Sequence, residues 1–323
     1  MKHRNKELLW LLLTVCVFID FVYGISIEYK IKDAIYYSKT SYSGIQTIIF
    51  WSAKGKSIAC EAKIFFKAPN KMRIEYEGNK NLSQHILIDN GEYEYLYDKT
   101  KNIAYVSISP HKNIGDIDEK FKLLKKNYQF VLLGSENIAG RVTDVVAIKS
   151  QNKENPWRKI WIDNEYHIIL QDKTFQEDEL LHLSNFTTIN FPKELSDDLF
   201  ILPGNVKIIP KTSKVTSFTD IKKLQEKTKF KLFLPSYIPE GYVFDKADLV
   251  EKKKYEFVRI QYSDGLNILS LFETPTKIDF RGYQEPEQIM NYKLVYRKYK
   301  GINFTIIGVL SHKMLSQIIN SIK

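Results

Sequence analysis

Alternating apolar and polar residues run through most of the first two hundred positions and predict a segment rich in β-strands. The dipeptide Asn90-Gly91 separates two such runs and is a strong hairpin signal, because both residues tolerate a positive φ angle. The other strands are expected in YSGIQTIIFWSA, KSIACEAKIFFKA, KMRIEYEG, FVLLGSENIAGRVTDVVAIKSQ, PWRKIWIDNEYHIILQDKTF and ELLHLSNFTTINF. A sheet of this length, strongly curved with one face buried against helices, would leave a concave apolar side.

Helical spacing of apolar residues occurs at only a few places in the chain. The stretch 26–39 has apolar residues at helical intervals, and 116–130 predicts a second helix with Asp116 as its N-cap. Later, FTDIKKLQEKTKF predicts a short helix. The last residues predict a closing helix that begins after Ser311 and has one apolar face.

A polar stretch with two prolines, 203–217, has no clear period and predicts a linker. Beyond it, four strands are expected in VRIQYSD, NILSLFETP, YKLVYRKY and INFTIIGVL. With 323 residues the chain is long enough for two cores. We therefore predict domains at 25–202 and 218–323, in an α+β class.

The N-terminus has the pattern of a secretory signal peptide over residues 1–24. A basic leader, MKHRNKE, precedes the apolar run LLWLLLTVCVFI, and small-enough residues follow at a cleavage position. Because Asp20 ends the apolar run well short of a bilayer span, retention as an anchor is the minor alternative. The mature chain then has one cysteine, Cys60, so it forms no internal disulfide, and a buried, inert thiol is expected.

Charge and motifs exclude several classes of function. The net charge of +10 comes from basic residues interspersed with acidic ones, so the pattern does not favour nucleic-acid binding and leaves contact with an anionic membrane surface open. The histidines are scattered, and no metal-ligand, phosphate-loop or nucleophile motif is present. We therefore expect no catalytic residues, no metal and no cofactor.

Three stretches of the second half resemble one family. LPSYIPEGYVF is followed by YSDGLNILSLFETP and then by YKGINFTIIGVLSHKMLSQIINSIK. This order is similar to the C-terminal domain of the RseB/MucB family, whose "(S/T)DGL…SVF" hairpin is matched by residues 262–272. Val309-Leu310-Ser311 stands where that family commonly has an acidic residue and a proline. In the first half, APNKMR at 68–73 and the PWRKIWIDNEYHIILQDKTF stretch resemble the family's LolA/LolB-like domain.

The resemblance implies a fold and a function. The fold would be an open, curved antiparallel half-barrel wrapped around helices, followed by a smaller α+β domain. The function would be that of a non-enzymatic regulator in the periplasm or extracytoplasmic envelope, which binds the extracytoplasmic part of a membrane anti-sigma factor. Its apolar cavity would sense acyl chains or lipoproteins. The alternative is a LolA-like carrier of lipid or lipoprotein, although simple carriers of that type lack a second domain.

Two groups of site residues follow from these expectations. For the cavity, strand alternation and the half-barrel analogy give Tyr93, Tyr95, Tyr97, Trp161 and Ile169. The simpler interpretation of the three tyrosines is a sheet face covered by a helix. For the partner surface, proximity to the hairpin gives Arg259, Tyr262 and Asp264. Exposed residues without a partner are an equally good interpretation of Arg259 and Asp264.

Overall fold

The computed structural model describes residues 27–36, 38–51, 57–80, 82–112, 116–152, 155–209, 214–251, 255–276 and 293–323. The predicted signal peptide, 1–24, lies outside the described residues. Among those residues no helix is long and apolar enough to cross a membrane.

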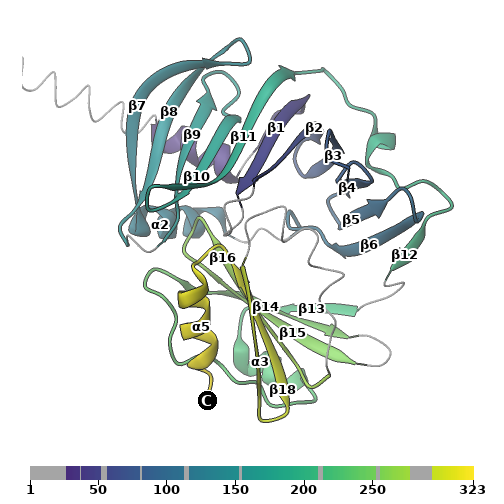
Figure 1. Cartoon of the computed structure of the whole chain (residues 1–323), viewed down its shortest axis with the longest axis vertical. Helices are drawn as coiled ribbons and strands as arrows, with labels where there is room; N and C mark the ends of the chain where they lie inside the picture. Colours follow the sequence, from purple (N-terminus) through teal and green to yellow (C-terminus); the bar gives the residue numbers. More distant parts are fainter. Residues whose placement is uncertain are drawn as a thin grey trace, which may run out of the picture.

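The first of two sheets has twelve strands and is open, because β12 and β7 lie at its two ends (Figure 1). Its order is β12-β6-β5-β4-β3-β2-β1-β11-β10-β9-β8-β7. All pairs are antiparallel except β12 with β6. The strands are β1 (Tyr42–Trp51), β2 (Ser57–Lys67), β3 (Lys71–Glu77), β4 (His85–Asp89), β5 (Tyr93–Asp98), β6 (Ile103–Ile108), β7 (Tyr128–Ile138), β8 (Arg141–Ser150), β9 (Trp157–Asp163), β10 (Ile169–Gln176), β11 (Glu179–Asn190) and β12 (Lys207–Ile209).

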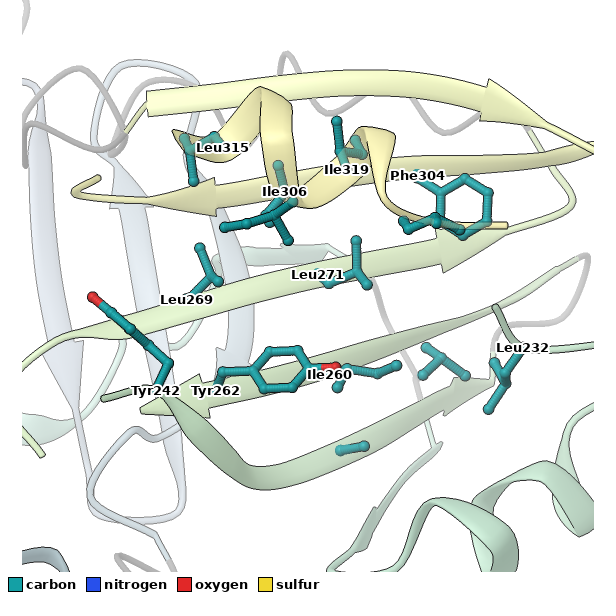
Figure 2. Packing of buried hydrophobic residues seen from close by; sticks show 14 of the residues in the cluster. Leu232, Tyr242, Ile260, Tyr262, Leu269, Leu271, Phe304, Ile306, Leu315 and Ile319 are labelled. Atoms are coloured by element: carbon teal, nitrogen blue, oxygen red, sulfur yellow. The ribbon is translucent and has the colours of Figure 1, made fainter. Parts of the chain in front are cut away.

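The second sheet has six antiparallel strands in the order β13-β14-β15-β16-β18-β17. The strands are β13 (Lys214–Phe218), β14 (Val243–Glu251), β15 (Glu256–Ser263), β16 (Ile268–Thr274), β17 (Lys293–Tyr299) and β18 (Ile302–Gly308). Its core lies between the sheet and the last helix, α5 (His312–Asn320) (Figure 2). Leu271, Phe304, Ile306, Leu315 and Ile319 are among the side chains that fill it.

Few helices accompany the sheets. Residues 27–36 are helical, and α2 (Ile117–Asn127), the 3-10 helix η1 (Asp197–Phe200) and α3 (Ile221–Lys227) follow. The predicted N-caps are confirmed at two helices: the Asp116 carboxylate accepts hydrogen bonds from two N–H groups of the first turn of α2, and the Ser311 hydroxyl accepts one at α5. The predicted wrapping of a sheet around helices stays a prediction.

One face of the first sheet, which we call the inner face, holds two apolar clusters. A cross-strand row defines it, because residues paired across antiparallel strands point to the same side. Ile48 belongs to the cluster on β1–β3, and Ile160 belongs to the cluster beneath helix 27–36 and α2. The complete row is Cys60, Ile48, Ser184, Asp172, Ile160 and Val146.

The opposite, outer face carries a smaller cluster at the β2–β5 end. Phe65, Ile88, Tyr95 and Tyr97 pack there against the side chains of η1, chiefly Phe200. The outer face of the middle strands carries Lys63, Lys159 and Lys173, each displaced by one residue from an inner-face position. The inner face therefore carries the two larger apolar clusters, and the outer face carries the smaller cluster at the β2–β5 end and the lysines of the middle strands.

The segment that the sequence predicts as a linker, 203–217, differs from expectation. It contains β12, which joins the first sheet, and most of β13, which joins the second. Both strands are short edge strands, so they leave no long alternating pattern in the sequence. The domain limits 25–202 and 218–323 stay a prediction, although the core of the second sheet contains only residues from 218 onward.

Candidate functional site at the junction of the two sheets

The turn between β15 and β16 lies against the first sheet and forms the junction (Figure 1). Asp264 is fully buried, and its Oδ1 accepts hydrogen bonds from the N–H groups of Leu266 (2.9 Å) and Asn267 (2.6 Å). The Ser263 hydroxyl accepts another from the Gly265 N–H at 3.0 Å. Short polar side chains of this kind favour turns because they satisfy backbone donors locally. The sequence Ser-Asp-Gly-Leu-Asn therefore builds a self-supported tip.

Side chains at the end of α2 and the start of β7 continue this polar network across the junction. The Tyr128 hydroxyl, at the start of β7, donates to Asp264 Oδ2 at 2.6 Å. Asn267 Nδ2 donates to Tyr128 Oη at 2.8 Å, and Asn127 Nδ2 donates to the carbonyls of Gly241 (2.8 Å) and Asp264 (2.9 Å). The buried carboxylate thus has donors from both sheets, as a buried charge requires.

Apolar contacts surround the network. Leu266 packs against the inner-face cluster that includes Leu124 and Phe121 of α2. The Tyr36 hydroxyl donates to the Gly265 carbonyl at 2.5 Å, so helix 27–36 also contacts the turn. Lys120 and Asp245 form an ion pair of 3.7 Å between α2 and β14. Both helices that cover the inner face therefore contact the second sheet.

At Gly265 the turn of the second sheet packs tightly against the backbone of α2. The φ angle of Gly265 is +94°, and a Cβ atom built there would lie 2.5 Å from the Leu124 backbone nitrogen. A side chain at this position would meet backbone, which cannot move aside as a flexible side chain can. Glycine is therefore required both by the turn conformation and by the docking of the turn on α2.

Burial keeps the junction tyrosines neutral. Desolvation, and then the nearby Asp264 carboxylate, raise the pKa of Tyr128 far above its ordinary value. The same two causes, burial first, raise the pKa of Tyr36. Both hydroxyls consequently remain protonated and can donate hydrogen bonds at any physiological pH.

A polar centre separates the two apolar clusters of the inner face. Arg158 makes a two-pronged ion pair with Asp172, and Ser184 lies next to Asp172 in the cross-strand row. Burial, and then the Arg158 charge, lower the pKa of the neighbouring His182 to about 4. His182 is therefore neutral at neutral pH, and the Arg158–Asp172 pair carries compensating charges.

The residues predicted for a cavity do not come together. Ile169 lies at the inner-face cluster beneath the helices, but Trp161 points to the outer face, where Lys159 and Lys173 lie over its ring at 4.6 and 5.2 Å. Tyr95 and Tyr97 pack on the outer face against η1, and Tyr93 is 45% exposed. Tyr93, Tyr95 and Tyr97 do alternate along β5, so they share one face of the strand. The sequence does not show which face of the sheet the helices cover.

The residues predicted for a partner surface are mostly buried. Asp264 is the centre of the junction, and Tyr262 lies in the core of the second sheet with 8% exposure. Arg259 is partly accessible, and its guanidinium donates to Asp248 Oδ2 at 2.6 and 3.1 Å. Tyr262 and Asp264 therefore present no free surface in this structure.

The first-sheet half of the junction was missed by sequence reasoning. Tyr36, Asn127 and Tyr128 lie more than a hundred residues from the turn that they contact. The one local signal was the Ser-Asp-Gly tripeptide, which predicts a tight turn and does not reveal what the turn binds.

Residues 82–201 match the model of the family described as the MucB/RseB N-terminal domain. No curated protein matches the sequence.

Three solved structures resemble the chain over most of its length. They are MucB in complex with MucA(peri), MucB alone and the Pseudomonas aeruginosa MucA/MucB complex, and each covers 91% of this chain with a TM-score of 0.57. The sequence identities are 13%, 13% and 12%, in that order, and the matches cover 96%, 95% and 96% of the solved chains. Identities this low show the fold. The predicted resemblance to the RseB/MucB family is therefore confirmed: residues 82–201 match its N-terminal domain model, and the chain shares the fold of MucB.

Proposed function

We propose that this chain is a non-enzymatic, extracytoplasmic regulator that binds the extracytoplasmic part of a membrane anti-sigma factor. The observation that carries the proposal is the likeness to MucB over 91% of this chain, which extends across both sheets; MucB has been solved with MucA(peri) bound. A second sheet docked on the first favours a regulator over a simple carrier, because a carrier needs only a ligand-holding sheet.

Two features of the described residues concern metal binding and thiol reactivity. In the ranges that the structure describes, no three His, Cys, Asp or Glu side chains are grouped to hold a metal ion. Cys60 is buried, and burial raises the pKa of its thiol to about 11, so a thiolate nucleophile does not form there at neutral pH.

Capture followed by reconstitution tests the proposal. Residues 25–323, used as bait in a detergent extract of the source membranes, should retain a single-span protein whose cytoplasmic part binds a sigma factor. The purified extracytoplasmic segment of that protein should then bind in isothermal titration calorimetry. Recovery of diverse lipoproteins and lipids, with no such membrane protein, would instead assign the chain to the carriers.

We further propose that the inner face of the first sheet binds an apolar ligand, an acyl chain or the acyl group of a lipoprotein. Ile58, Ile74 and Tyr76 are only partly buried there, beside the cluster of β1–β3. Apolar surface of this kind can bind an acyl chain with few polar contacts, at about 25 cal/mol per Å² of apolar area removed from water.

A pair of variants distinguishes the two faces. Ile74→Asp should weaken the binding of a fluorescent fatty acid at least about tenfold, because a carboxylate would have to be desolvated by the ligand. Tyr95→Asp, on the outer face, should leave the affinity unchanged. Thermal unfolding followed by circular dichroism checks that both variants fold. Loss of affinity in Tyr95→Asp alone would place the ligand on the outer face and contradict the inner-face assignment.

A further inference from the structure

The end of the second sheet opposite the junction carries a cluster of basic and aromatic side chains, which we call the basic end. It contains Lys231, Phe233, Leu234, Tyr237, Arg297, Tyr299 and Lys300. β16 runs from the junction turn to Thr274, which pairs with Asn303 just after the β17–β18 turn. The basic end therefore lies at the pole of the molecule away from the first sheet, with the C-terminus (bottom of Figure 1).

Three segments are held together at this end. Lys300 and Gly301 both have positive φ angles, 47° and 80°, and form a tight hairpin turn. The Arg297 guanidinium donates to the carbonyls of Ile319, in the last turn of α5, and of Ile322, just beyond the helix, at 2.8 and 2.9 Å. Pro235 forms a bridge with Ile322, and the Ser236 N–H donates to the Ser321 carbonyl. The basic end is therefore an ordered surface.

Its cations lie over aromatic rings. The Lys231 and Lys300 ammonium groups are each 5.5 Å from the centre of the Phe233 ring. Lys300 and Arg297 are each 4.8 Å from the Tyr299 ring centre. Cation–π contacts hold these charges in place. Lys231 and Lys300 are exposed, so their ammonium groups are accessible to an anion.

The described residues leave the cations of the basic end without an acidic partner. Within the described ranges, Lys231 and Lys300 form no ion pair, and the hydrogen bonds of Arg297 are to carbonyls. The carboxylate beside Phe233 is Glu273, whose Oε2 accepts from the Phe233 N–H at 3.0 Å. Burial raises the pKa of Glu273 to about 8, so this group is mostly uncharged at pH 7. In the segment 229–240, which includes Lys231 and Phe233, the acidic residue is Glu240, and it is exposed.

Apolar side chains project beside these cations. Leu234 is 43% exposed and Tyr237 is 41% exposed, and Lys313 of α5 lines a shallow hollow together with Tyr237. An exposed leucine and tyrosine among uncompensated lysines is the composition of surfaces that lie at the headgroup level of a bilayer, with the apolar groups inserted and the lysines at the phosphates.

We propose that the basic end is a docking surface for the anionic headgroups of a phospholipid membrane. It would bind reversibly, because it combines a few charges with two apolar side chains and has no long apolar segment. The proposal goes beyond the regulator function and does not depend on it. It assigns to the second sheet a role in bringing the protein to the membrane surface.

Vesicle sedimentation tests this surface with residues 25–323. The protein should bind vesicles of phosphatidylcholine with phosphatidylglycerol, should not bind phosphatidylcholine alone, and should dissociate as salt is added. Lys231→Glu with Lys300→Glu should reduce the partition coefficient at least about tenfold. The matched control is Lys99→Glu with Lys193→Glu, which makes the same change of net charge at exposed lysines of the first-sheet half and should have little effect.

Leu234→Asp tests the apolar part and should also reduce binding, without changing the cations. Equal losses in the test pair and the control pair would show that net charge alone attracts the protein and would overturn the proposal. Failure of the wild-type protein to bind anionic vesicles would overturn it as well. Binding to soluble polyglutamate without binding to vesicles would assign the basic end to an acidic polypeptide instead.

Discussion

At the scale of single residues, Gly265 offers the sharpest test of the junction. Gly265→Ala should destabilise the protein for two reasons: its φ of +94° is unfavourable for an L-residue, and the new Cβ would meet the Leu124 backbone. Gly140→Ala has a similar φ of +76° but open space around its Cβ. Urea unfolding should therefore show a loss of about 1 kcal/mol for Gly140→Ala and several kcal/mol for Gly265→Ala. Equal losses would mean that the turn can move away from α2 without cost.

Glu273 gives the molecule a predictable dependence on pH. Burial raises its pKa from an ordinary value of 4.5 to about 8 in the folded state. Between these values the unfolded chain has released the proton while the folded chain retains it. The stability that the protonated carboxyl confers is complete below about pH 4.5 and is lost as pH rises toward 8, by up to about 1.4 kcal/mol per pH unit.

Glu273→Gln should remove this contribution, since an amide fits the same space and does not ionise. The variant should match the wild-type protein near pH 5 and exceed its free energy of unfolding at pH 8. The measurement is urea unfolding across that range. Glu94, whose pKa burial raises to about 7, gives a slope of the same sign and should leave a residual pH dependence in the variant. If the free energy of unfolding changed with pH in the same way in the wild-type protein and in Glu273→Gln, the raised pKa of Glu273 would be contradicted.

At the scale of elements, the junction joins one turn of the second sheet to α2 and the start of β7. Tyr128→Phe removes the hydroxyl that donates to the Asp264 carboxylate and should cost about 1.5 to 3 kcal/mol, because a buried charge loses a donor. Asp264→Asn preserves the acceptor that organises the turn. In the Tyr128→Phe background it should cost less than in the wild type, since a neutral amide is easier to bury without that donor.

The double-mutant cycle should yield a coupling energy of about 1 to 3 kcal/mol. The control is Tyr105→Phe, which removes a hydroxyl from a tyrosine that is 36% exposed in the first sheet and should change stability little. Additive effects of Tyr128→Phe and Asp264→Asn would show that the two side chains do not act together in solution.

Elements with a complete local signal could be predicted from the sequence. The strands of the hairpin around Asn90-Gly91, the Asp116 N-cap and the apolar face of α5 all formed as expected, because each depends on neighbours within one or two turns. β12, β13, β14 and β6 were not predicted. The first two are short edge strands, and their conformation is set by the partners β6 and β14 rather than by their own residues.

At the scale of the whole molecule, the junction could not be predicted because its two halves are remote in the sequence. Periodicity shows which residues of Tyr93–Asp98 share a face, yet only the order of twelve strands decides which face the helices cover. The same limit explains why Asp264, predicted on a surface, is buried. A polar residue in a turn is buried only when another part of the chain supplies its donors, and here that part is Tyr128.

The two sheets should therefore keep a fixed relative position in solution, held by the chain near 203–217 and by the junction. Spin labels at Lys99→Cys and Lys223→Cys, exposed residues of the two halves, should give one narrow distance distribution in pulsed electron resonance. Cys60 would stay unlabelled, because it is 4% exposed and burial raises its pKa to about 11. Tyr128→Phe with Asp264→Ala should broaden the distribution, because covalent connection alone permits rotation about the linking segment. Tyr105→Phe should leave it narrow. An unchanged distribution in the junction variant would show that the linking segment and the surrounding apolar contacts fix the arrangement without the polar network.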